Sequence, residues 1–141
     1  MSVFTTIRDR LGKYAARVTS LGQLVVAPYD YSEPVSKSLD SINTAFNFIE
    51  PLAGHAIVIT DIIASADKDV SNTTPADVDV YESDAVDSLT SIKGIVRPQL
   101  ARSAGRDLIG LNLLVPTGFW VNAKTTDATI LLTIMFYRVP V

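Results

Sequence analysis

The sequence contains no cysteine and only one histidine among its 141 residues. Without cysteine there is no disulfide framework, no thiolate nucleophile and no cysteine-ligated metal. The single histidine, His55, stands among apolar residues, and a zinc site there would need carboxylates as all its other ligands. We therefore interpret His55 as a structural or surface residue, and we expect neither a metal nor a cofactor.

Motifs of nucleotide-binding enzymes and of serine hydrolases are also lacking. Neither Gly-x-x-x-x-Gly-Lys-Ser/Thr nor Gly-x-Gly-x-x-Gly occurs, and there is no Gly-x-Ser-x-Gly elbow. The first eight residues lack the apolar core of a secretory signal, and no apolar run reaches the roughly 18 residues that span a bilayer. We expect a soluble protein that is not an enzyme and has no membrane partner, kept in a cytoplasm or released with the particle to which it belongs.

Charge is scarce and unevenly placed. Charged residues make up 19% of the chain and hydrophobic residues 48%, which is typical of an all-β domain with much buried strand or of a subunit that hides surface in an oligomer. Residues 1–20 carry a local charge of +3, so the rest of the net −3 chain sums to −6. The basic end is either the solvated face of a helix or a contact for a different neighbour.

The first 18 residues predict a helix, because apolar residues recur at spacings of three and four. These residues are Phe4, Ile7, Leu11, Tyr14 and Val18. We expect this segment to be an arm that orders on contact, followed by a short strand at Leu21–Ala27. The Ser/Asp/Pro-rich residues 28–45 predict an extended connection, either a linker or a strap across a neighbour. The predicted organisation is an arm and strap over residues 1–44 and a body over residues 45–141.

Strand signals dominate the body, with Pro, Gly, Asn and Asp turns between the strands and no helices. The predicted strands are Phe46–Ile49, His55–Ala66, Asp77–Ser83, Ser91–Val96, Leu108–Pro116, Phe119–Lys124 and Thr129–Val139. Together with Leu21–Ala27 they make about eight short strands. This pattern predicts an all-β fold, an antiparallel jelly-roll-like β-sandwich with an N-terminal helical or extended arm.

The final strand is apolar on both faces. Strand alternation places one set of residues on one side, namely Ile130, Leu132, Ile134 and Phe136. The other side holds Leu131, Thr133, Met135 and Tyr137. A strand with one face in water alternates more cleanly, so we predict that Leu131, Met135 and Tyr137 lie at a subunit contact or beneath a covering segment.

Three further features suggest ligands, and each has a plainer interpretation. Acidic residues between Asp61 and Asp87 suggest calcium, but without EF-hand spacing a solvated loop rim is favoured. Arg97, Arg102 and Arg106 lie close together, yet no aromatic residues alternate with them, so we expect no nucleic acid. Trp120 suits a sugar platform or an interface anchor, and core packing equally well.

Three segments carry a family resemblance: "PLAGHAIVITDIIASADKDV", "ADVDVYES" and "GLNLLVPTGFWVNAKTTDATILLTIMFY". In strand rhythm they resemble the small β-sandwich proteins that tailed bacteriophages carry on their heads, the capsid decoration (cement) proteins and head-fibre or fibre-tip modules. The similarity covers roughly residues 45–139. It implies a homotrimer that buries an apolar strand face around its axis and reaches onto the capsid with an arm from each subunit.

The resemblance leaves two functions open. In the first, the chain decorates the virion capsid surface after assembly in the host cytoplasm. Its arm then binds the major capsid protein through Phe4, Ile7, Arg8, Arg10, Leu11, Lys13 and Arg17. In the second, it is the tip of a head or tail fibre that binds a host glycan near Trp120 and the loop aspartates.

Overall fold

The computed structural model describes residues 5–8, 14–18, 24–28, 33–66, 75–127 and 129–141. The chain divides into two compact units, Met1–Tyr31 and Ser32–Val141, and each is described by itself.

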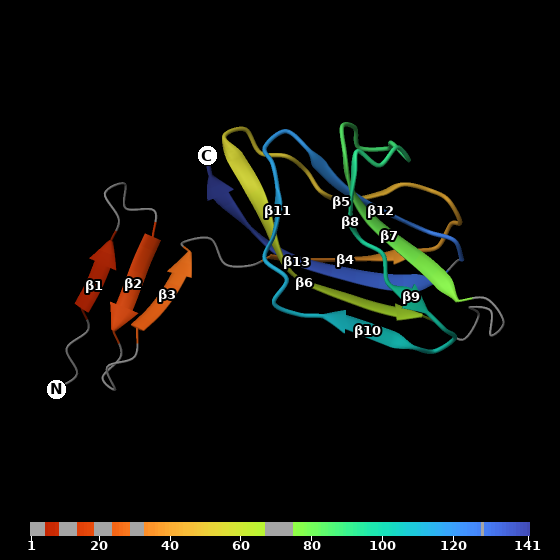
Figure 1. The fold of residues 1–141 in the computed structure, drawn as a ribbon, viewed down its shortest axis with the longest axis horizontal. Helices are drawn as coiled ribbons and strands as arrows, with labels where there is room; N and C mark the ends of the chain where they lie inside the picture. Colours follow the sequence, from red (N-terminus) through yellow and green to blue (C-terminus); the bar gives the residue numbers. More distant parts are fainter. Residues whose placement is uncertain (1–4, 9–13, 19–23, 29–32, 67–74, 128) are drawn as a thin grey trace. The chain divides into compact units, whose positions relative to one another are not determined.

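The N-terminal unit contains a three-stranded antiparallel sheet. Its strands are β1 (Thr5–Arg8), β2 (Tyr14–Val18) and β3 (Leu24–Pro28), in the order β1-β2-β3 (Figure 1). The helix predicted for this region is wrong over β1 and β2. Thr5, Thr6, Ile7 and Val18 are β-branched, and such residues favour strands over helices. The strand predicted at Leu21–Ala27 is confirmed within its described residues, 24–27, and continues through Pro28.

The second unit is a β-sandwich of two antiparallel sheets, which Figure 1 shows as two layers. Its strands are β4 (Glu33–Leu39), β5 (Phe46–Ile49), β6 (His55–Ala66), β7 (Ala76–Ser83), β8 (Lys93–Val96), β9 (Gln99–Leu100), β10 (Gly105–Leu108), β11 (Leu113–Val115), β12 (Trp120–Thr125) and β13 (Ile130–Pro140). The first sheet has the order β10-β6-β13-β4, and β11 also pairs with β6. The second has the order β5-β12-β7-β8, and β9 also pairs with β7. The predicted antiparallel β-sandwich is confirmed.

The strand pairs of the sandwich are nested in the sequence. The first strand of this unit, β4, pairs with the last, β13, and the next strand inward, β5, pairs with β12. Inside them β6 pairs with β10, and β7 pairs with β8. Each step along the chain from β4 to β7 therefore meets a partner that lies earlier in the sequence than the previous partner. Most sheet contacts consequently join residues far apart in the chain.

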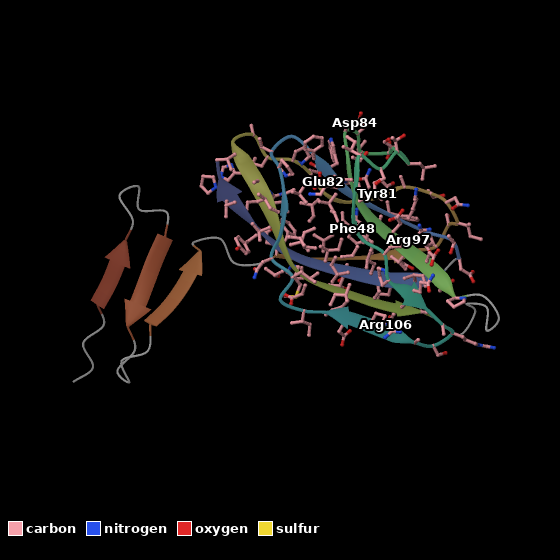
Figure 2. All side chains as sticks on the ribbon, viewed as in Figure 1. Phe48, Tyr81, Glu82, Asp84, Arg97 and Arg106 are labelled. Atoms are coloured by element: carbon pink, nitrogen blue, oxygen red, sulfur yellow. The ribbon has the colours of Figure 1, made fainter. Side chains whose placement is uncertain are left out.

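The core lies between the two sheets and follows strand alternation. On β13, Ile130, Leu132 and Ile134 are fully buried and Phe136 is almost so, as the alternation predicts. Phe48 from the second sheet joins the same cluster (Figure 2). Burying one such side chain contributes about 1.5–3 kcal/mol, so this layer of β13 supplies a large part of the stability of the sandwich.

Two segments differ from the sequence-based expectation. β4 lies within the predicted strap and is an edge strand of the first sheet, hydrogen-bonded to β13. The strand predicted over Leu108–Pro116 is split into β10 and β11. The break lies opposite a bulge in β6, where Thr60 has no register partner on β13 because Met135 pairs with Asp61 and Phe136 with Ile59. The Gly110 N–H donates to the Asp61 carboxylate (3.0 Å), which holds the interrupting loop against the bulge.

Candidate self-association face

The surface of the first sheet that points away from the core carries exposed apolar side chains. We call this surface the outer face. Leu131 on β13 is 51% exposed, Ile63 on β6 is 39% exposed, and Leu114 on β11 is 57% exposed. Met135 and Tyr137 are half-buried on the same face. Exposed leucine and isoleucine on one sheet face are typical of an interaction surface when they cluster.

Leu131 is surrounded by small, uncharged residues. Its neighbours across the sheet are Ser38 on β4 and Ser65 on β6, and Gly105 on β10 follows Ser65 in the same row. Two residues further along β13, at the next position on the outer face, the hydroxyls of Thr133 and Ser36 are hydrogen-bonded at 2.7 Å. The row that contains Leu131 therefore combines one large apolar side chain with hydroxyl groups and carries no charge.

A hollow opens beside Leu131. It has a volume of about 370 Å³ and is lined by Ser38, Ser65, Ala66, Thr129 and Leu131. We call it the Leu131 hollow. Its wall at Thr129 has a left-handed backbone (φ 69°), which a β-branched residue rarely adopts. The Thr129 N–H donates to the Leu39 carbonyl at 2.8 Å, which ties this wall to β4.

The charged residues of the outer face lie outside the Leu131 row. Asp107 on β10 is paired in register with Ile63, and Asp61 is paired with Met135. Asp61 is half-buried and accepts the N–H of Gly110. These carboxylates therefore border the apolar residues without interrupting the row around Leu131.

The structure brings the three predicted interface residues, Leu131, Met135 and Tyr137, onto one face of one strand. Alternation in the printed sequence was sufficient to find them. Ile63 and Leu114 were missed. Ile63 could have been found from the alternation along β6. Leu114 could not, because its place on the outer face depends on the split between β10 and β11.

The predicted capsid-binding residues belong to the N-terminal unit. Ile7 and Arg8 are in β1, and Arg17 is in β2. The remaining four, Phe4, Arg10, Leu11 and Lys13, lie outside the described residues. Their predicted role stays a prediction.

A second exposed element is the loop Asp84–Ile92, which we call the β7–β8 loop. It covers part of the second sheet, where Tyr81 and Asn122 are completely buried. Tyr81 and the first residue of the loop, Asp84, are labelled in Figure 2. The Tyr81 hydroxyl donates to the Ser88 carbonyl at 2.8 Å, and the Asn122 amide donates to the Ala85 carbonyl at 2.9 Å. Burial raises the pKa of the Tyr81 phenol, and the nearby Asp79 carboxylate raises it further. The loop is thus fixed by side chains beneath it.

The β7–β8 loop lies near Trp120 in the pairing of the sheet. Trp120 is half-buried and pairs in register with Ser83, the last residue before the loop. Asp84 and Asp87 in the loop are exposed, as are the apolar residues Val86 and Leu89. The loop therefore presents both acidic and apolar side chains to solvent.

The other acidic residues are distributed and not gathered into one site. Asp77 accepts hydrogen bonds from Arg97 (3.1 Å) and Gln99 (2.7 Å). The Asp79 carboxylate lies 3.8 Å from Lys124, and the Glu82 carboxylate lies 3.7 Å from Lys93. Within the described ranges, no group of three or more His, Cys, Asp or Glu side chains is placed to hold a metal ion.

The single histidine and the remaining arginines have ordinary surroundings. His55 is half-buried at the start of β6, with its Nδ1 atom 3.1 Å from the Ala53 carbonyl oxygen. Arg97 is paired with Asp77, while Arg102 is exposed before β10 and Arg106 is exposed on β10. In the part of the chain that the structure describes, no helix is long and apolar enough to cross a membrane.

Comparisons with protein-family models, with curated proteins and with solved structures find no match to this chain.

Proposed function

We propose that this chain is a structural virion protein, a decoration (cement) protein that binds the outer surface of a bacteriophage capsid as a homotrimer and stabilises the shell. The observation that carries the proposal is the outer face. A sandwich with a well-buried core exposes Leu131, Ile63 and Leu114 together on one sheet. Such a face supports assembly with further copies of the chain, as a decoration protein requires.

The strand pairing supports a jelly-roll topology. The nested pairs β4–β13, β5–β12, β6–β10 and β7–β8 divide between two sheets in the arrangement of a rolled-up long hairpin. Jelly rolls are common in viral capsid and lectin domains. This support is an analogy of fold, and the function depends on the surfaces that the fold presents.

The N-terminal unit is the proposed capsid-binding part. Residues 1–31 hold four basic and two acidic residues, a net charge of +2, while residues 32–141 hold eight basic and thirteen acidic residues, a net charge of −5. Capsid surfaces are often acidic, so a basic unit would be steered towards them. Binding across neighbouring capsomers would add its free energy to the assembled shell and help it resist the pressure of packaged DNA.

The test is a binding experiment on capsids that lack decoration. The full chain should co-sediment with them, and a chain that begins at residue 32 should not. A full-length Arg8→Glu/Arg17→Glu variant should bind more weakly, and raising the salt concentration should weaken the full chain in the same way, since screening reduces charge attraction. Undiminished binding by the shortened chain would refute the role of the N-terminal unit.

The β7–β8 loop favours a second candidate, a head- or tail-fibre tip that binds a host glycan. The fixed loop exposes Asp84 and Asp87 near Trp120, and carboxylates beside an aromatic ring suit a sugar. A glycan array and antibody labelling of phage particles separate the two functions. Glycan binding that is lost in a Trp120→Ala variant would favour the fibre tip, whereas labelling over the whole capsid surface would favour decoration.

A further inference from the structure

We draw no further inference here: the strongest candidate, the apolar outer face of the first sheet beside the Leu131 hollow, carries none, because nothing in the structure shows what covers it.

Discussion

At the residue scale, the Asn122 side chain takes part in several hydrogen bonds of the sandwich. It is fully buried on β12, donates to the Ala85 carbonyl and accepts a hydrogen bond from Asn47 at 3.2 Å. Beside it, Tyr81 is buried under the same loop and donates to Ser88. Buried polar groups cost free energy unless they are paired, so these two residues hold the β7–β8 loop in one position.

Replacing Asn122 by alanine should destabilise the second unit. The change removes the hydrogen bonds that a fully buried amide makes with Ala85 and Asn47, and such a loss costs about 1–3 kcal/mol. The free energy of unfolding, measured with urea, should fall by this amount. The control is Ser91→Ala, an exposed change in the same loop that should stay within about 0.5 kcal/mol of the natural chain. An Asn122→Ala protein as stable as this control would contradict the role assigned to the side chain.

Tyr81 should also make stability depend on pH at the alkaline end. Its pKa is raised in the folded protein by burial and by Asp79, whereas an unfolded tyrosine ionises near about 10. Its contribution is therefore fully present below about pH 10 and is lost as the pH rises from there through the folded pKa. The absorbance titration of the natural chain minus that of Tyr81→Phe should show one tyrosine with a midpoint above about 10. A midpoint at or below that value would argue against the buried environment.

At the scale of the element, β13 separates two roles between adjacent residues. Leu132 is completely buried against the second sheet, while its neighbour Leu131 is half exposed on the outer face. The strand lies between β6 and β4, and all of its pairing is antiparallel. One strand therefore supplies both a layer of the core and the centre of the outer face.

Alanine at these two positions should have very different effects. Leu132→Ala should lower the free energy of unfolding by about 2–5 kcal/mol, because it removes buried methyl groups and leaves a cavity. Leu131→Ala should change it by less than about 0.5 kcal/mol when measured at concentrations where the chain is monomeric. Denaturant unfolding of both variants checks this, and similar losses at the two positions would mean that the alternation of β13 is misassigned.

At the scale of the whole molecule, the boundary between units lies before β4. The second unit begins at Ser32, so β4 at Glu33–Leu39 belongs to the sandwich. β4 covers one side of β13 along seven paired positions and places Leu39 in the core. A functional division of the chain must keep this strand with the body.

Two shortened chains test the boundary. Residues 32–141 should fold with a single cooperative transition and a free energy of unfolding close to that of the sandwich in the full chain. Residues 45–141 should unfold or aggregate, because loss of β4 exposes an edge of the apolar strand β13. Circular dichroism and urea unfolding report both results. Equal stability of the two fragments would show that β4 is dispensable.

Much of the sandwich could be predicted from the sequence, and the exceptions have physical causes. β6, β7, β12 and β13 are long or strictly alternating, and their apolar residues decide which face is buried. β4 was missed because an edge strand needs few inward apolar residues, and of its seven only Val35 and Leu39 are apolar and packed on the core. The helical spacing in residues 4–18 was coincidental over β1 and β2, and in β1 three of the four residues are β-branched.

The candidate site was only partly accessible to sequence analysis. Leu131, Met135 and Tyr137 follow from alternation along one strand. The hollow beside Leu131 requires Ser38, Ser65 and Thr129 from three separate segments, and their meeting depends on sheet register. No local pattern encodes that meeting, so pairing in three dimensions was needed to find it.

The nested pairing has a consequence for biosynthesis. The strand that joins β4 to β6 within the first sheet is β13, which is translated after every other strand of the sandwich. A nascent chain that has not yet reached residue 130 holds β4 and β6 with open edges and an uncovered apolar layer. The sheet can close only after β13 leaves the ribosome, so the sandwich folds late in synthesis and, with such distant contacts, slowly. Extra chaperones that shield unpaired strands should therefore raise the yield of folded protein. They should raise it more than a faster rate of synthesis would.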